Sequence, residues 1–367
     1  MPEPDPDPTS GVTPLDFELA SGRIHAEDRG PRDEILVIGV PGLSANLRGF
    51  DFLAERLADR RRVVTLDLHG RGHSEVTPPG TYGWANHARD VIGVADALGV
   101  DEFVVLGQSM GAFVAMEVAR QAPGRLRAAV LLDACGLPDP ETIAPIRAAV
   151  ERLGAVYPSF AGYLALVQQL GTVRPWSSYW ERYFRYELAD VPGGVRARSD
   201  HAAVIEDADY GESHSPGDLW PSLGMPVLLA RATQPLVGAS GFIIPEAERD
   251  AFLATVESAS LVEVDANHYG INPPPRPGPG DLDRRAAPVR QPAPDHRRGP
   301  AGVVVGPNRA LVPGKRQAAN ASASNRASST RGRIVAPCRH RGGFGADPRG
   351  HRAPDPGVRR YRRGEGW

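Results

Sequence analysis

The sequence predicts an α/β fold in which a mostly parallel sheet is covered by helices on both faces. Short runs rich in Val, Ile and Leu alternate with segments of helical periodicity from residue 35 onward. With 367 residues and 41% hydrophobic content, the chain is long enough for one large core. A strand, a sharp turn and a helix meet at Ser109. Catalytic groups on such a sheet are expected at the carboxyl ends of its strands.

The elements are expected in a regular order along the chain. Two short strands, 17–20 and 23–26, are predicted to pair as a hairpin through Ser21 and Gly22. Continuous apolar runs, typical of buried parallel strands, lie at 35–39, 62–68, 103–106, 126–133, 226–230 and 260–265. Helical spacing of apolar residues marks 50–57, 84–98, 112–119 and 244–256.

Ser109 lies in the pentapeptide Gly-Gln-Ser-Met-Gly between a buried strand and a helix. A serine on so tight a turn needs small neighbours, because a β-carbon at Gly107 or Gly111 would collide with the turn. The turn also brings Ser109 to a helix N-terminus, where free N–H groups favour a developing oxyanion. The alternative interpretation is a serine that only caps the helix. With this context, residues 16–272 resemble the α/β-hydrolase fold family.

The resemblance implies a catalytic base and acid for this serine. His268 follows the last strand, the position of the family's catalytic histidine. The strand at 226–230, after which most relatives carry the acid, is followed by no carboxylate before Glu246. Asp133 ends the strand after the nucleophile helix, which resembles the placement in haloalkane dehalogenases and some lactone hydrolases. We therefore expect Ser109, His268 and Asp133 to form a triad. Glu246, Asp209 and Asp265 are the alternatives, and Asp133 could instead cap the entry to the insertion that follows.

The resemblance also implies an oxyanion hole from two backbone N–H groups, those of Leu43 and Met110. Gly42 matches the glycine of the family's His-Gly turn, and Pro41 replaces the histidine. The Asp67-x-x-Gly-x-Gly-x-Ser74 loop also resembles the family, and we interpret it as a turn that shapes the scaffold.

The region 136–223 interrupts the sheet pattern and resembles the family's helical cap, with helices expected at 146–156, 160–170 and 177–188. Its aromatic residues predict an apolar substrate, and Trp176, Trp180 and Tyr183 are the candidate pocket residues. The domain organisation expected is a disordered N-terminus at 1–15, core segments at 16–135 and 224–272, the cap at 136–223, and a disordered tail at 273–367.

The tail differs from the rest of the chain in charge. Residues 1–272 carry 22 basic and 38 acidic residues, a net of −16, whereas residues 273–367 carry 20 and 6, a net of +14. Its Arg, Pro, Gly and Ser content predicts disorder. Either the tail is a basic arm for nucleic acid or anionic surfaces, or it is translated out of frame; we favour the second interpretation and expect no nucleic-acid partner.

Several classes of protein are disfavoured by the sequence. Cys135 and Cys338 give no disulfide framework, and no secretory signal or membrane-spanning run is evident, so a cytoplasmic location without membrane contact is expected. No metal-ligand spacing or dinucleotide fingerprint occurs, so no metal or cofactor is expected.

The function expected is hydrolysis of a carboxylic ester or lactone of an apolar small molecule through an acyl-enzyme. The same triad could cleave a C–C bond or transfer an acyl group, and the fold could serve as a non-catalytic ligand-binding protein. The oligomeric state does not follow from the sequence.

Overall fold

A computed structural model of the chain describes residues 11–236, 238 and 241–272. They contain an eight-stranded sheet of order β1-β2-β4-β3-β5-β6-β9-β10. The strands are β1 (Thr13–Leu19), β2 (Gly22–Arg29), β3 (Leu36–Val40), β4 (Arg62–Leu66), β5 (Phe103–Gln108), β6 (Leu126–Leu132), β9 (Val227–Ala232) and β10 (Ala259–Val264). The β1–β2 and β2–β4 pairs are antiparallel and every pair from β4 to β10 is parallel, which confirms the predicted fold class.

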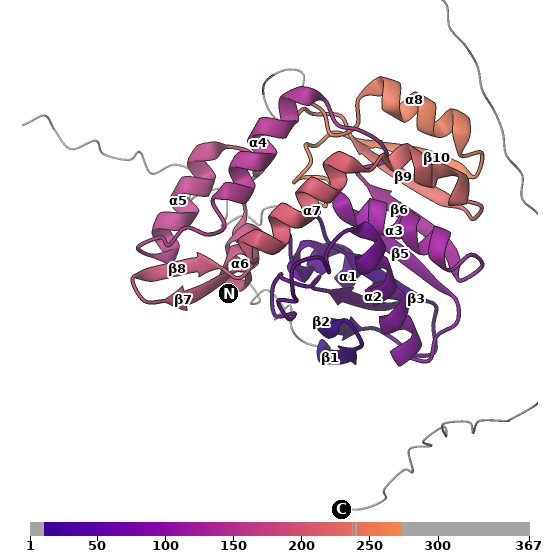
Figure 1. Cartoon of the computed structure of the whole chain (residues 1–367), viewed down its shortest axis with the longest axis horizontal. Helices are drawn as coiled ribbons and strands as arrows, with labels where there is room; N and C mark the ends of the chain where they lie inside the picture. Colours follow the sequence, from indigo (N-terminus) through magenta and orange to yellow (C-terminus); the bar gives the residue numbers. More distant parts are fainter. Residues whose placement is uncertain (1–10, 237, 239–240, 273–367) are drawn as a thin grey trace, which may run out of the picture. The chain divides into compact units, whose positions relative to one another are not determined.

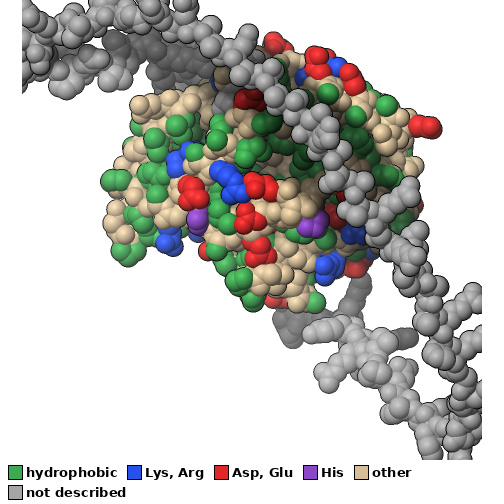
Figure 2. All heavy atoms as spheres, turned by 45° about the horizontal axis from the view of Figure 1, so that its top comes forward, with side chains coloured by type: hydrophobic (Ala, Val, Ile, Leu, Met, Phe, Trp, Pro, Cys, Tyr) green, Lys and Arg blue, Asp and Glu red, His purple; other side chains and the backbone are tan. Residues whose placement is uncertain are grey.

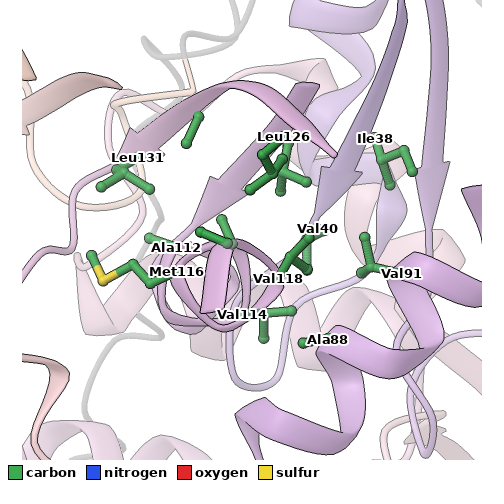
Figure 3. Packing of buried hydrophobic residues seen from close by; sticks show 14 of the residues in the cluster. Ile38, Val40, Ala88, Val91, Ala112, Val114, Met116, Val118, Leu126 and Leu131 are labelled. Atoms are coloured by element: carbon green, nitrogen blue, oxygen red, sulfur yellow. The ribbon is translucent and has the colours of Figure 1, made fainter. Parts of the chain in front are cut away.

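Helices cover both faces of the sheet because both faces are apolar. Along β5, Val105 joins one buried cluster and Leu106 the other. The first cluster packs against α2 (Trp84–Ala97), α3 (Met110–Gln121) and α8 (Glu246–Thr255), and the second against η1 (Leu47–Phe50) and α1 (Asp51–Leu57). In Figure 3, α3 and α2 lie side by side against the sheet, with Val118 of α3 close to Val40 of β3 and Val91 of α2 close to Ile38.

The parallel register brings several strand ends to one edge of the sheet. Gly107 of β5 pairs with Val40 of β3 and Leu131 of β6, and Leu132 of β6 pairs with Ala230 of β9. The loops that follow β3, β5, β6 and β9 therefore begin at the same edge. This alignment brings together residues that are far apart in the sequence.

The chain leaves the sheet after β6 and returns at β9. The insertion consists of α4 (Pro140–Glu151), α5 (Phe160–Leu170), α6 (Ser178–Glu187), β7 (Leu188–Val191), β8 (Gly194–Ala197), α7 (His201–Ser213) and η2 (Pro216–Ser222). Figure 1 shows α7 between the sheet and the group formed by α4, α5, α6 and the β7–β8 hairpin. The sequence predicted α5 and α6 and, at 146–156, a helix that begins six residues later than α4 does, but neither the hairpin nor α7. The short strands of the hairpin and the few buried positions of α7, Ala203, Val204 and Asp207, leave little periodic signal.

The expectation of disorder at 1–15 is wrong for its last residues. Thr13 begins β1 and pairs with Asp28 of β2, because the edge of the sheet supplies backbone hydrogen-bond partners. The predicted tail at 273–367, the end of the chain beyond Asn272, lies outside the described residues.

Candidate active site

Ser109 occupies a strained turn between β5 and α3. Its backbone has φ 55° and ψ −125°, a conformation that residues with a side chain rarely adopt. A β-carbon at Gly107 would overlap the carbonyl group of Gly111, and one at Gly111 would overlap the carbonyl oxygen of Val40. The two glycines are therefore required by close backbone contacts, as the sequence predicted.

Asp133 directly follows β6 and is the other non-glycine residue with positive φ, at 50°, among the described residues. Its side chain is buried, at 2% exposure. Oδ1 accepts the N–H of Ala232 at 2.9 Å, and Oδ2 lies 2.8 Å from Nδ1 of His268. One carboxylate oxygen is thus held by the β9 backbone while the other contacts the imidazole.

His268 lies on the loop after β10, and Asn267 anchors that loop. The fully buried Asn267 side chain donates to the carbonyl of Thr172 at 2.7 Å and accepts the N–H of Gly270 at 3.1 Å. The side-chain nitrogen of Gln108 lies 3.3 Å from Nε2 of His268. The Gln108 amide donates to Nε2, so Nε2 is the unprotonated nitrogen and the proton is on Nδ1, whose N–H donates to Asp133.

Ser109 and His268 line one cavity of about 760 Å³ between the sheet edge and the insertion. Within the described part of the chain, the Ser109 hydroxyl forms no hydrogen bond, and Gln108 contacts the nitrogen that a serine hydroxyl would use. Such contacts often tighten only when substrate binds. The structure thus brings together Ser109, His268 and Asp133.

The cavity wall is largely apolar. Residues that contribute apolar surface include Leu43, Trp84, Met110, Phe113, Pro138, Ile143, Ile146, Leu236 and Ile243. Two of the candidate pocket residues, Trp180 and Tyr183, also line it. The expectation for Trp176 is wrong, because its ring stacks on Phe184 at 6.0 Å and is absent from the wall. The face drawn in Figure 2 is hollowed, and hydrophobic side chains gather in that hollow.

The two candidate oxyanion-hole donors lie at the wall of the same cavity. Met110 is the first residue of α3, so its N–H has no partner within the helix. The N–H of Leu43 donates to no described residue. A β-carbon at Gly42 would lie 2.8 Å from Oε1 of Gln108 and 3.0 Å from Cβ of Ser109, so glycine allows this loop to approach the serine.

Comparison with known proteins identifies the family. A model of the alpha/beta hydrolase fold matches residues 35–268. The chain belongs to the α/β-hydrolase family. An α/β-hydrolase from Novosphingobium aromaticivorans, of known structure, shares the fold with a TM-score of 0.63 at 23% identity, covering 75% of this chain and 97% of that one.

Two curated relatives from Pseudomonas putida match parts of this α/β-hydrolase. N-formylmaleamate deformylase is 37% identical over 111 residues, which cover 30% of this chain and 41% of the relative. 2-Hydroxymuconate semialdehyde hydrolase is 31% identical over 176 residues, which cover 48% and 61%. The chain thus spans about half the length of these two relatives.

Arg71 is a residue of this α/β-hydrolase site that the sequence did not single out. Its fully buried guanidinium donates to the carbonyl of Leu43 through Nε at 3.0 Å and Nη2 at 2.8 Å, and Nη2 lies 2.6 Å from Asp207 of α7. Burial alone would raise the pKa of Asp207, but His87 and Arg71 more than offset it and lower the pKa to about 2. Arg71 therefore holds the carbonyl of Leu43, in the residue whose N–H is the candidate oxyanion donor, and connects this loop to the insertion.

No sequence signal identified this contact. Arg71 lies within the Asp67–Ser74 loop, which we expected only to shape the scaffold. That role is also present, because Asp67 accepts the N–H groups of Leu47 and His73, each at 2.9 Å. Gln108, by contrast, could have been suspected from its position next to Ser109.

The three alternative acids of this α/β-hydrolase contact residues other than His268. Asp265 accepts from Gln234, Asp209 pairs with Arg147, and Glu246 lies 4.0 Å from Arg249.

Burial raises the pKa of the Cys135 thiol to about 12, so this side chain is a poor nucleophile. Among the residues that the structure describes, no cluster of His, Cys, Asp or Glu is placed to hold a metal ion, and no helix is long and apolar enough to cross a membrane.

Proposed function

We propose that this α/β-hydrolase cleaves a carboxylic ester or lactone of an apolar small molecule, with Ser109 as nucleophile, His268 as base and Asp133 as the acid that orients it. The observation on which the proposal rests is the 2.8 Å contact between Nδ1 of His268 and Oδ2 of Asp133 beside the strained Ser109 turn. A histidine held in this tautomer has an unprotonated Nε2 that can act as base, which is what a serine hydroxyl needs to become a nucleophile.

In the first half of the reaction, Oγ of Ser109 bonds to the substrate carbonyl carbon while its proton passes to Nε2 of His268. Gln108 must release Nε2 for this step. The carbonyl oxygen becomes an oxyanion that the N–H groups of Leu43 and Met110 stabilise. When the intermediate collapses, the bond to the alcohol oxygen breaks and that oxygen takes the proton from His268.

In the second half, water attacks the acyl-enzyme. Its proton passes to Nε2 of His268 as the new C–O bond forms, and collapse returns the proton to Oγ of Ser109 with release of the carboxylic acid. The buried Asp133 carboxylate stabilises the imidazolium in both halves. Each cycle consumes one ester and one water and leaves the serine unchanged.

The apolar wall supports an apolar acyl or alcohol group, because burial of such a group is favourable by about 25 cal/mol per Å². A second candidate reaction, hydrolysis of a C–C bond next to a carbonyl, is favoured by the similarity to 2-hydroxymuconate semialdehyde hydrolase. Arg152 lines the cavity and forms no ion pair with any described residue, so it could receive an acidic group of such a substrate.

The test is covalent labelling of the full chain with a fluorophosphonate probe, followed by mass spectrometry of the labelled peptide. We expect one label per chain on Ser109, none in Ser109→Ala, and much slower labelling in Asp133→Asn. Ser260→Ala is the matched control, since Ser260 is exposed on the edge strand β10, outside the cavity, and should label like the parent.

Labelling of the folded parent at another serine, or no labelling at all, would contradict the proposal. The bond cleaved is then decided by comparing neutral p-nitrophenyl esters with an acidic dienone that can undergo C–C hydrolysis. A higher kcat/KM for the esters supports the first reaction, and a higher value for the dienone supports the second.

A further inference from the structure

A second cavity, of about 590 Å³, lies between the insertion and the loops of the core and shares no residue with the cavity at Ser109. We call it the arginine groove. It is lined by Arg48, His73, Phe160, Ser178, Glu181, Arg182, Arg185, Tyr186 and Arg198. Core and insertion both contribute: Arg48 and His73 belong to the core, and the remaining residues belong to the insertion.

The charges of the groove are unbalanced. Four arginines face one carboxylate, Glu181. Arg48 is compensated by Glu27 and by Asp51, whose oxygens lie 2.5 Å and 3.5 Å from its guanidinium. Arg182, Arg185 and Arg198, by contrast, form no ion pair with any residue of the described chain. These three guanidinium groups have no carboxylate of the described residues within ion-pair distance, and together they outnumber Glu181 in the groove.

The electrostatic environment of His73 agrees with this imbalance. Partial burial lowers the pKa of His73, and the positive charges of Arg198, His25, Arg23 and Arg48 lower it further. A proton is therefore disfavoured at the position where a bound anion would be favoured.

Two of the uncompensated arginines are already oriented. The guanidinium carbon of Arg185 lies over the ring of Phe160, 3.4 Å from its centroid, and its N–H groups donate to no described residue. Arg198 donates through Nε to the carbonyl of Tyr186 at 3.1 Å and keeps its terminal nitrogens for another partner. A planar guanidinium held in this way is suited to bidentate contact with phosphate oxygens.

We propose that the arginine groove binds a small phosphate-bearing anion, of the size and charge of a diphosphate, which bridges the insertion and the core. Arg182, Arg185 and Arg198 contact its oxygens from the insertion, while Arg48 and His73 face it from the core. A diphosphate is preferred to a single carboxylate because Arg182, Arg185 and Arg198 exceed Glu181 by two positive charges, more than one carboxylate neutralises.

The test is calorimetric titration of the full chain with inorganic pyrophosphate at constant ionic strength. The variants are Arg182→Gln, which removes an exposed side chain without a hydrogen bond, and Arg185→Gln. Arg196→Gln is the matched control: Arg196 is an exposed arginine on β8, two residues from Arg198, and lies outside the groove. We expect about tenfold weaker binding in each groove variant and parental affinity in the control.

The Arg-rich segment 273–367 is the same in every variant, so pyrophosphate bound there would give one affinity throughout. Equal affinities in parent, groove variants and control would therefore overturn the proposal, as would the absence of binding to the folded parent. Adenosine diphosphate, titrated in parallel, distinguishes the source of the anion. If adenosine diphosphate binds more tightly than pyrophosphate, the ligand is a phosphorylated organic molecule; if the two bind equally, it is the free anion. In both cases the groove variants must weaken the binding of adenosine diphosphate.

Discussion

The cavity at Ser109 and the arginine groove are both formed where the insertion meets the core, yet their polar groups have opposite arrangements. At the first cavity, Asp207 in the wall and Asp133 behind His268 are paired with protein partners and hold backbone and side chains in place. In the groove, Arg182, Arg185 and Arg198 have no carboxylate partner among the described residues. A charged side chain in a cavity can hold neighbouring protein groups in place, or it can bind a ligand. Whether the side chain already has a partner in the protein distinguishes these two roles.

The largest effect is expected from Asp133→Asn, which tests whether charge at the first cavity serves geometry. An amide can donate to Nδ1 and so favours the wrong histidine tautomer, and hydrolysis should fall by about 10³- to 10⁴-fold. The rate of ester hydrolysis measures this. Asp265→Asn is the control, because Asp265 is exposed and binds Gln234. A similar loss in both variants would refute the assignment of Asp133.

The second prediction concerns the connection between the insertion and the candidate oxyanion hole. Arg71→Met leaves the Asp207 carboxylate and the Leu43 carbonyl without their guanidinium partner. Loss of one member of a buried pair lowers the free energy of unfolding by about 3–5 kcal/mol. Denaturant unfolding measures that loss, and kcat should also fall because the Leu43 peptide is no longer held.

The exposed Arg89→Gln serves as the control for Arg71→Met. A destabilised Arg71→Met enzyme with parental kcat at low temperature would mean that Arg71 is only structural and does not position the loop.

The third prediction uses pH to examine a charge buried inside the insertion. Glu187 is buried and accepts from Tyr163 at 2.8 Å; burial raises its pKa from 4.5 to about 7. The native state thus binds this proton more tightly than the unfolded state, so Glu187 lowers stability as pH rises from about 4.5 to 7. The full effect is at most about 3 kcal/mol.

Glu187→Gln should remove this part of the pH dependence, because the amide does not ionise. Unfolding in urea at pH 5 and pH 8 measures the difference between parent and variant. If the free energy of unfolding changes by the same amount between pH 5 and pH 8 in parent and variant, Glu187 has an ordinary pKa in the folded protein.

The smallest effect is expected from Arg152→Gln, which tests the one feature that the two cavities share, an arginine without a carboxylate partner among the described residues. If the substrate is acidic, kcat/KM should fall about tenfold, because one charge-assisted hydrogen bond is lost. A neutral ester should be unaffected. An equal loss with both substrates would indicate altered packing of α4 rather than recognition of charge.

Much of the fold was predictable because it depends on local patterns. Apolar runs at 35–39 and 103–106 and helical spacing at 84–98 indicated the parallel sheet and its helices, and Gly-Gln-Ser-Met-Gly indicated the turn at Ser109. The hairpin β7–β8 and helix α7 were missed because their short or weakly amphipathic sequences carry little of this pattern. Trp176 was misassigned because composition does not reveal which way an aromatic ring faces.

The sequence by itself determined the sheet, the strained serine and the order of the chemically important residues along the chain, because strand periodicity and turn glycines act between near neighbours. Only the tertiary structure decided that Asp133 reaches His268 and that Arg71 holds the Leu43 carbonyl. It also decided that the arginines of α6 and Arg198, which follows β8, converge with Arg48. These contacts join residues 28 to 150 positions apart. They depend on the strand register and on the packing of the insertion, which no local pattern specifies.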